Sequence, residues 1–358
     1  MERRRLGRTG LQVSAIGFGG ARLDEHPDLA MATVHRALDR GINFIDTARA
    51  YGGSEEHLGN ALRGRRAQSI LATKALIEDP DTTLQSLETS LPLLGTDAVD
   101  LFYAHACDNE ERFAWTMRPG GALASLEQAR ARGLTRFIGI SFNHFLPFQD
   151  GRSGVDRMKA LIETDTFDVI QVPFSLIRIE RVEQEVLPMA AARDIGVVIN
   201  FPTADGLLTR EWGVFRPMFE PYVATPCQAA LLYLLLYPEV TCVLSGMSTP
   251  DIADENCAVG SIVASIPVPV RADLLRQVDA LGLGPCRSCG RCAPYTHGIP
   301  VPQIMTYHDA ERRFGIQAAR QRYESYRDQV MACSSFEGAD AVCPEGFDVL
   351  AEVKRAYA

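Results

Sequence analysis

Four side chains suited to moving a proton onto a carbonyl stand at or just after the ends of short apolar segments. Asp46 closes INFID, Lys74 closes ILATK, His105 closes VDLFYAH, and Tyr51 follows in the loop after Asp46. A carbonyl reduced by hydride needs its developing oxyanion protonated, which a phenol can do if its pKa, ordinarily about 10, comes closer to the working pH. A nearby ammonium favours the phenolate, and a carboxylate holds that ammonium in place. The set predicts reductive chemistry with Tyr51 as proton donor and His105 orienting the carbonyl or relaying the proton.

Each of these residues also has an ordinary structural interpretation. Asp46 could cap the following loop, Tyr51 could be a surface aromatic, Lys74 a solvated charge at a strand end, and His105 a core histidine. Their coincidence at the ends of neighbouring segments favours the catalytic interpretation, because the C-terminal ends of the strands of a closed α/β barrel meet at one rim.

The chain alternates apolar, strand-like segments with helical ones. Eight strands are expected, at residues 15–18, 43–46, 70–74, 99–105, 137–141, 169–173, 197–201 and 240–245. Helices are expected at residues 28–40, 54–63 and 122–132, each followed by a glycine that can adopt a left-handed cap. This pattern predicts an α/β protein with a (β/α)8 TIM barrel, and residues 4–13 predict a small hairpin across its bottom. A doubly wound sheet is the alternative, but its glycine-rich fingerprint, with an acidic residue about 20 positions on, is missing.

Length and charge limit the partners. The 358 residues exceed the roughly 250 that one barrel takes, so we expect a barrel at residues 1–265 and a second domain at 271–358, beyond the proline-rich stretch 266–270. The net charge of −9 and pI near 5.4 argue against a nucleic-acid partner. No run of about 18 apolar residues and no signal-type stretch occurs. We therefore expect a cytoplasmic chain that acts on a small molecule without a membrane.

Five of the nine cysteines follow residue 285. Cys286, Cys289 and Cys292 form a CxxCxxC motif, and Cys343 precedes Pro344. Three cysteines within seven residues lie closer than in most tetrahedral zinc sites, whereas bacterial ferredoxins use this spacing with a distant cysteine before proline. The pattern favours an iron–sulfur cluster. Zinc, or a tail that binds no metal, is the alternative.

The order of several motifs resembles a known family. These are the segments VSAIGFGGARL, GINFIDTARAYGGSEEHLGNAL, ILATK, VDLFYAH, RFIGIS, VIQVPFSL and SGMSTPDIADEN. Over roughly residues 4–260 they resemble the aldo/keto reductase superfamily, and the DTAxxYGxSExxLGxAL stretch is highly specific. The resemblance implies reduction of an aldehyde or ketone to an alcohol, or the reverse, with NADP or NAD as cofactor. It also implies a catalytic tetrad of Asp46, Tyr51, Lys74 and His105.

The resemblance further implies where the cofactor lies. Ser141 and Gln171 would hold the nicotinamide carboxamide, and the pyrophosphate and adenosine would lie near the end of the eighth strand. The implied cofactor-binding set is Gly20, Ala21, Asp46, Ser141, Gln171, Phe201, Gly246, Met247, Ser248, Glu255 and Asn256. Two features depart from the family. The usual basic contacts to a 2′-phosphate fall at Gly246 or Ser248 and at Ile252, which carry no charge, and the aromatic that stacks on the nicotinamide falls at Asn200, beside Phe201.

The tail is similar to the two-cluster, ferredoxin-like, partly helical extension on one branch of this superfamily. In that extension each motif lends its last cysteine to the other cluster. Here the first motif ends at Tyr295 or Thr296, and the second retains Cys333 and Cys343 but reads Phe336 and Ala339 between them. The resemblance implies one 4Fe-4S cluster on Cys286, Cys289, Cys292 and Cys343, with Cys333 left over. Its role would be structural, or electron transfer with an unknown partner.

Residues 106–121 are expected to form a long loop at the barrel mouth. Phe113, Trp115 and Met117 could shape a pocket there for a carbonyl or alcohol substrate, or could simply pin the loop down. His144, just beyond Ser141, could also face this pocket. A second functional hypothesis is a nicotinamide-binding redox-sensing or electron-transfer protein, but the intact tetrad favours catalysis.

Overall fold

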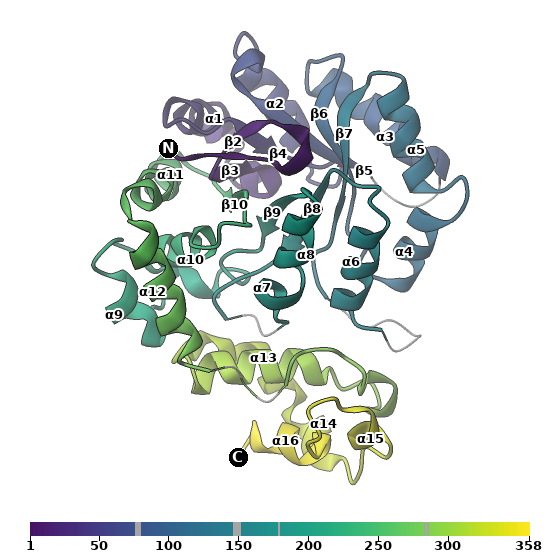
Figure 1. The fold of residues 1–358 in the computed structure, drawn as a ribbon, viewed down its shortest axis with the longest axis vertical. Coiled ribbons are helices and arrows are strands. Elements are labelled where there is room, and N and C mark those ends of the chain that lie inside the picture. The colour runs from purple at the N-terminus through teal and green to yellow at the C-terminus, as the bar shows by residue number, and fades with distance from the viewer. Residues whose placement is uncertain (76–79, 146–151, 178–179, 283, 285) are drawn as a thin grey trace.

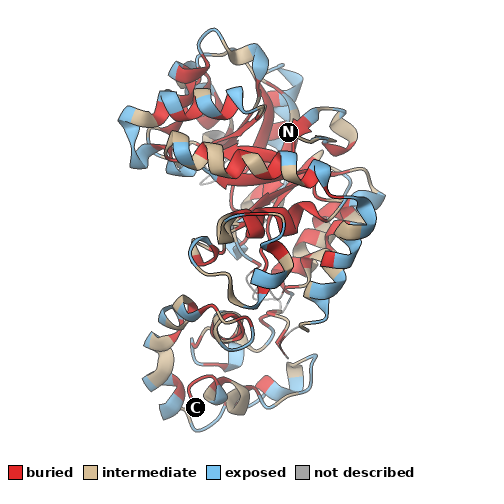
Figure 2. Ribbon diagram, turned by 90° about the vertical axis from the view of Figure 1, so that its left-hand side faces the viewer, coloured by how far each residue is buried: buried red, intermediate tan, exposed pale blue. Residues whose placement is uncertain are grey.

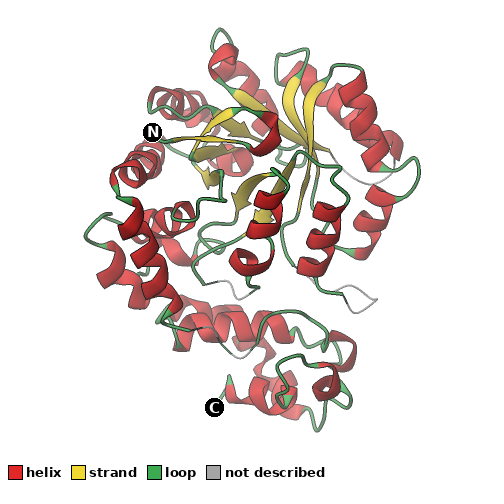
Figure 3. Cartoon of the chain, in the orientation of Figure 1, coloured by secondary structure: helices red, strands yellow, loops and turns green. Residues whose placement is uncertain are grey.

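The structure is a computed structural model that describes residues 1–75, 80–145, 152–177, 180–282, 284 and 286–358. Eight parallel strands close into a barrel in the order β10-β3-β4-β5-β6-β7-β8-β9 (Figures 1 and 3). They are β3 (Ile16–Gly19), β4 (Phe44–Asp46), β5 (Ile70–Ala75), β6 (Val99–Ala104), β7 (Thr135–Ser141), β8 (Val169–Pro173), β9 (Gly196–Asn200) and β10 (Cys242–Gly246). The closed barrel confirms the predicted (β/α)8 architecture and excludes the doubly wound sheet.

The strands are buried on both faces, which explains why they form nearly continuous apolar runs in the sequence. Phe44, Leu101, Tyr103, Val169 and Val198 pack inside the barrel as one apolar cluster. The outward faces contribute to a second, larger core beneath the helices. Because this pattern is strong, every predicted strand lies within two residues of an observed one at both ends.

Helices cover the outside of the barrel and bury their inner faces against the strands (Figure 2). They are α1 (Ala30–Asp39), α2 (Ser54–Leu62), α3 (Pro80–Leu93), α4 (Glu110–Met117), α5 (Ala122–Ala131), α6 (Gly154–Glu163), α7 (Val182–Glu185), α8 (Leu187–Ala192), α9 (Arg216–Phe219), α10 (Pro226–Leu235) and α11 (Pro250–Ser265). The three predicted helices correspond to α1, α2 and α5 and are confirmed.

The expected loop at residues 106–121 is wrong in part, because it contains helix α4. The side chain of Asn109 accepts a hydrogen bond from Arg112 N at 2.9 Å and so caps the helix. Glu110 and Glu111 lie in the first turn, where negative charge interacts favourably with the helix dipole. Local capping thus forms a helix where only a loop was expected.

A hairpin closes the bottom of the barrel, as the sequence predicts. Strands β1 (Arg3–Arg5) and β2 (Gln12–Ser14) pair antiparallel, and Leu6 is fully buried in the cluster inside the barrel. The Arg4 guanidinium donates hydrogen bonds to the carbonyls of Leu235, Tyr237 and Val240, just before β10 begins. The end of the barrel at which the strands begin is therefore plugged, and chemistry is confined to the opposite rim.

A sharp bend marks the end of the barrel helices. Helix α11 ends at Ser265, and α12 (Val268–Asp279) begins after Pro267, at an angle of 114°. This break falls in the proline-rich stretch that the sequence singles out. Among the described residues, no single helix has the length and apolar composition to cross a membrane; the α11–α12 pair meets both criteria only when its two helices are counted together.

The tail lies below the barrel in Figure 1 and has a small core of its own. Its later helices are α13 (Val301–Arg312), α14 (Arg327–Ala332), α15 (Ala339–Val342) and α16 (Val349–Arg355). The carboxylate of Glu211, in the segment after β9, accepts hydrogen bonds from Gln317 N and Ala318 N at 2.6 and 3.1 Å. The tail therefore docks on segments that leave the C-terminal rim of the barrel.

Candidate active site

The strand ends bring four predicted residues into one cluster. Asp46 ends β4 and Lys74 lies near the end of β5, two residues beyond the position paired with Asp46. Lys74 Nζ donates hydrogen bonds to Asp46 Oδ1, to the carbonyl of Thr47 at 2.9 Å and to the Tyr51 hydroxyl at 3.3 Å. His105, directly after β6, places its ring edge-on to Tyr51 with centroids 5.6 Å apart.

Burial is unequal within this cluster. The Lys74 and Asp46 side chains are only 1% and 2% exposed, and His105 is also buried. Tyr51 is half-buried and is the most exposed of the four. The ion pair is therefore the buried part of the cluster, and Tyr51 is its most accessible member.

The electrostatics of the cluster follow from this burial. Burial alone would lower the pKa of Lys74, but the Asp46 carboxylate and the Tyr51 oxygen reverse the effect and raise it. Lys74 is therefore a stable cation. Burial, followed by the charges of Lys74 and Arg112, lowers the pKa of His105 to about 3. The imidazole is thus neutral near pH 7, and it can donate or accept a hydrogen bond without carrying charge.

Two predicted contacts to a nicotinamide carboxamide lie next to the cluster. Gln171, on β8, donates from Nε2 to Asp46 Oδ2 at 3.0 Å. Ser141, at the end of β7, accepts from Ala106 N at 3.0 Å and donates to the carbonyl of Ala104 at 3.3 Å. Gln171 thus contacts the cluster directly. Ser141 is instead hydrogen-bonded to the backbone of the residues before and after His105.

The other predicted cofactor residues line the ends of β3 and β10. Gly246, Met247 and Ser248 follow one another at the end of β10, where Gly246 is exposed and the other two are buried. On α11, Asn256 donates to Ser245 Oγ at 2.8 Å, and Glu255 accepts from Thr225 Oγ1 at 2.6 Å. These two α11 side chains therefore fasten the helix to β10 and to the start of α10.

Gly20 and Ala21 follow β3 directly. The carbonyl of Gly20 accepts a hydrogen bond from Ser54 Oγ at 2.9 Å, and a Cβ at this position would lie only 2.7 Å from that oxygen. Ala21 is exposed. The absence of a side chain at Gly20 thus lets the segment after β3 pack against the start of α2.

Phe201, another of the predicted cofactor residues, is not among the buried residues of the core. It is half-buried just beyond β9, has a φ of 51° and stacks obliquely on the exposed ring of His144 at 5.8 Å. Left-handed backbone at a phenylalanine is strained and is typical of functional sites. Asn200 donates to the carbonyl of Phe142, and its buried Oδ1 has no hydrogen-bond partner among the described residues.

Sequence reasoning missed several supporting side chains. Asp108, three residues beyond His105, accepts hydrogen bonds from the backbone N–H groups of Asn143 and His144 and so ties two rim segments together. Glu55, only 1% exposed, is ion-paired with Arg49 and accepts from Thr73. The available signal for both residues was an acidic side chain in a segment next to a strand end. Nothing in the sequence indicated which groups these carboxylates would bind.

The aromatic side chains of α4 pack onto the main core. Phe113, Trp115 and Met117 are partly buried against it, and the guanidinium of Arg118 lies 4.2 Å from the Trp115 ring. Cation–π contacts of this kind hold a segment in place. The described contacts therefore match the expectation that these residues pin the segment down.

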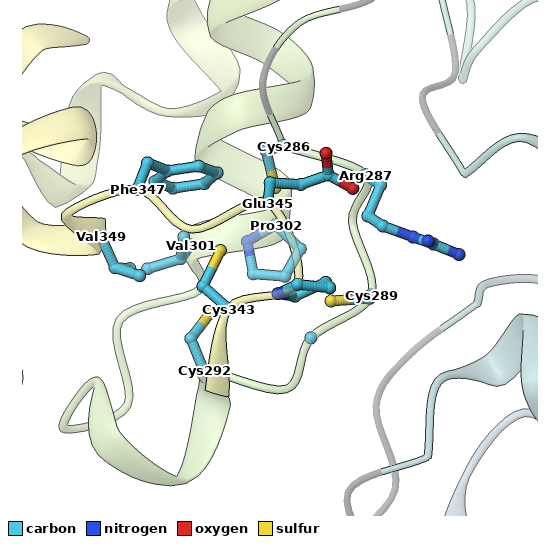
Figure 4. Close-up of a pocket in the computed structure, with 12 residues that line it drawn as sticks. Cys286, Arg287, Cys289, Cys292, Val301, Pro302, Cys343, Glu345, Phe347 and Val349 are labelled. Atoms are coloured by element: carbon cyan, nitrogen blue, oxygen red, sulfur yellow. The ribbon is translucent and has the colours of Figure 1, made fainter. Parts of the chain in front are cut away.

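Four of the tail cysteines line one pocket. Cys286, Cys289, Cys292 and Cys343 all contribute to its wall (Figure 4), and Cys333 is not among the described residues that line it. Burial, and then the neighbouring thiols, raises the pKa of Cys286 to about 12. Among the described residues, no group of three or more His, Cys, Asp or Glu side chains converges so as to hold a single metal ion.

Known proteins resemble this chain along most of the barrel. L-galactose dehydrogenase of Arabidopsis thaliana is 30% identical over 312 residues, which cover 78% of this chain and 94% of that protein. The uncharacterized oxidoreductase YqkF of Bacillus subtilis is 28% identical, with coverages of 72% and 90%. The solved structure of aldo-keto reductase AKR11C1 from Bacillus halodurans superimposes with a TM-score of 0.62 at 25% identity, covering 76% of this chain and 96% of that one.

A further solved structure shares the fold alone. It is an aldo/keto reductase from Klebsiella pneumoniae in complex with NADP and acetate, with a TM-score of 0.62, 24% identity and coverages of 78% and 95%. Residues 15–267 match the model of the Aldo/keto reductase family, a range that ends before the cysteine-bearing tail. Together with the closed barrel, this match shows that the chain belongs to the aldo/keto reductase family and is an oxidoreductase.

Proposed function

We propose that this protein reduces an aldehyde or ketone to an alcohol with NAD(P)H, or oxidises the alcohol with NAD(P)+ in the reverse hydride transfer, with Tyr51 as general acid in the reduction. The observation that carries the proposal is the Tyr51 hydroxyl, 3.3 Å from a buried Lys74 ammonium that Asp46 holds in place. Support for the cofactor comes from a family member of the same fold that binds NADP. The residues at the barrel rim fit it, since Gln171 brings an amide to the catalytic cluster and the ends of β3 and β10 carry bare glycine backbone.

Each residue of the cluster has a separate task in the proposed reaction. Bound NAD(P)H supplies the hydride. Tyr51 donates its hydroxyl proton to the carbonyl oxygen as negative charge develops there. Lys74 stabilises the phenolate that remains, and Asp46 keeps the ammonium within reach of it. In alcohol oxidation the same groups act in the opposite direction.

His105 is proposed to act as a neutral hydrogen-bonding group. Its ring lies beside the Tyr51 ring, and its lowered pKa of about 3 keeps it uncharged at working pH. A neutral imidazole can orient the carbonyl oxygen towards the Tyr51 hydroxyl. It cannot serve as a cationic acid there.

Removing the Tyr51 hydroxyl tests the proton donor. Tyr51→Phe should lower turnover of para-nitrobenzaldehyde, or of whichever carbonyl a substrate panel identifies, by roughly 10²- to 10⁴-fold. The Kd for NADPH, read by fluorescence titration, should stay within about twofold, since the ring remains in place. Tyr295→Phe, at an exposed position in the tail, is the matched control and should turn over like wild type. Unchanged turnover in Tyr51→Phe would overturn the assignment.

The neutral state of His105 has a consequence for stability. Unfolded histidine takes up a proton near pH 6.5, but folded His105 does so only near pH 3, so its contribution to stability is lost as the pH falls through this window. Between about pH 7 and pH 5 the wild-type free energy of unfolding should fall by about 2 kcal/mol more than that of His105→Gln. Urea unfolding at both pH values measures this difference. Equal losses in the two proteins would contradict a buried, neutral imidazole.

For the tail, we propose a second domain at residues 271–358 that holds one 4Fe-4S cluster on Cys286, Cys289, Cys292 and Cys343. Four thiols around one pocket suit a polynuclear cluster, whose ligands surround a body larger than one ion (Figure 4). A single zinc ion instead needs its sulfurs about 2.3 Å from one point. Among the described residues no group of three or more His, Cys, Asp or Glu side chains is placed to hold a metal ion, so the proposal rests on the four thiols that share the pocket wall.

The proposed role of the cluster is structural. Two side chains of the pocket wall form ion pairs with the barrel: Arg287 with Glu185 at 2.5 Å and Glu345 with Arg181 at 3.6 Å. Both barrel residues lie in or next to α7, which follows β8. A cluster that orders the pocket would thereby also hold the tail against the catalytic rim.

Metal analysis of anaerobically purified protein tests the cluster. Wild-type protein and Cys333→Ser should each contain about four iron atoms and four sulfides per chain, because Cys333 lies outside the pocket wall. Cys343→Ser should lose most of both, because it removes one of four ligands. Zinc without iron and sulfide would refute the proposal, as would equal iron loss in the two variants.

A further inference from the structure

The segment after β6 places an arginine beside the catalytic cluster. His105 directly follows β6, and helix α4 begins soon afterwards, at Glu110. Thr116 of α4 is fully buried, and its Oγ1 lies 3.3 Å from the sulfur of Cys107. Arg112 lies one turn before Thr116 on the same face of the helix, because residues four apart share a face. Side chains on a helix lean towards its N-terminus, which directs Arg112 towards the segment that carries His105.

The charge of Arg112 reaches this segment. Burial, and then the Lys74 ammonium, lowers the pKa of His105 to about 3, and the charge of Arg112 contributes to the same shift. Burial raises the pKa of the Cys107 thiol to about 12, and the charge of Arg112 opposes part of this rise. Because the interaction of charges weakens with distance, both effects agree with the helix geometry in placing the guanidinium near His105.

The guanidinium of Arg112 is exposed and has no partner among the described residues. The hydrogen bonds of this residue belong to its backbone N–H and carbonyl, and its side chain forms no ion pair or ring contact there. The other charges of this region are already engaged, since Lys74 is paired with Asp46 and Asp108 accepts two backbone hydrogen bonds. Arg112 is therefore a positive charge at the barrel mouth that is available to a ligand.

The position of Arg112 separates it from the nucleotide end of the implied cofactor site. In the closed barrel, β6 lies three strands from β3 and four strands from β10, which is the opposite side. The resemblance assigns the pyrophosphate and adenosine to the end of β10, near Gly246 and Ser248. An anion that binds Arg112 therefore belongs to the molecule that reacts beside His105 and Tyr51.

We propose that Arg112 binds a carboxylate of the substrate, so that this protein reduces an oxo acid whose aldehyde or ketone group lies at Tyr51. A planar guanidinium binds the two oxygens of a carboxylate through two parallel hydrogen bonds. Its single charge matches that of a carboxylate, whereas a phosphate monoester carries up to about two negative charges. The inference rests on the proposed function, because it takes the reacting carbonyl to lie at Tyr51.

The isomers of carboxybenzaldehyde and their methyl esters test the inference. The 2-, 3- and 4-isomers hold the carboxylate at different distances from the aldehyde, and each ester is the uncharged counterpart of its acid. With NADPH or NADH, wild-type protein should reduce at least one acid with a kcat/KM roughly 10- to 100-fold above that of its ester. The preference should lie mainly in KM, because the ion pair forms equally with the bound substrate and in the transition state.

Replacing Arg112 should remove this preference. Arg112→Gln should reduce the acid and its ester with similar kcat/KM, whereas Arg112→Lys should keep part of the preference because it keeps the charge. For the ester, kcat/KM of Arg112→Gln should stay within about twofold of wild type. Circular dichroism checks that each variant is folded.

The matched control is Arg132→Gln. Arg132 lies at the C-terminal end of α5, just before β7 begins and so at the end of the barrel opposite the catalytic rim, and is ion-paired with Glu88 at 2.7 Å. This variant removes the same charge as Arg112→Gln and should keep the wild-type preference for the acid. An equal loss of preference in both variants would show that overall charge selects the acid, and would overturn the inference.

Two further outcomes separate the inference from the proposed function. If wild-type protein reduces carbonyl compounds but prefers no acid over its ester, or if Arg112→Gln keeps the full preference, the inference is overturned and the proposed function stands. If wild-type protein reduces no carbonyl compound with either nucleotide, both fail.

Discussion

The ion pair between Lys74 and Asp46 is the constraint on which the catalytic rim depends. Both groups are almost completely buried, so removing one partner would leave an unpaired charge in the barrel at a cost of about 3–5 kcal/mol. The remaining hydrogen-bonding capacity of the pair is directed to the Thr47 carbonyl, the Gln171 amide and the Tyr51 hydroxyl. Of these three contacts, only Tyr51 leads towards solvent. Asp46 and Lys74 lie on two adjacent strands, so the packing of these strands fixes the ion pair. The ion pair in turn fixes the position of the Tyr51 phenol.

The barrel restricts the direction from which a molecule can reach that phenol. The hairpin and Arg4 close the lower end, while the tail docks beside the segments that follow β8 and β9. The side between β3 and β10 carries paired glycines, and the Arg22 side chain, ion-paired with Glu25, lies over one of them. The cysteine pocket lies in the tail, and two of its lining residues, Arg287 and Glu345, form ion pairs with Glu185 and Arg181 of the barrel.

The sequence predicted those parts of the fold and site on which many weak constraints agree. It did not predict those parts whose structure depends on a single local contact. Parallel strands buried on both faces gave eight recognisable apolar runs, and the strand-end rule placed Asp46, Lys74 and His105 together. The helix at residues 110–117 escaped prediction because it depends on the single cap at Asn109. Asp108 was missed because its partners, the backbone N–H groups of Asn143 and His144, lie far away in sequence and are brought to it by the paths of loops. Cys343 was grouped with the other cysteines because it precedes a proline, as in ferredoxins, but its place in the same pocket depends on how the whole tail folds.

A double-mutant cycle on kcat/KM tests the central claim most directly. Tyr51→Phe, Lys74→Met and the double variant would be compared, with folding checked by circular dichroism. If Lys74 acts through the Tyr51 hydroxyl, the double variant should lose no more than the more damaging single variant, because the two side chains work as one unit. Losses that simply multiply would show that the ammonium and the phenol act independently, and would contradict the account.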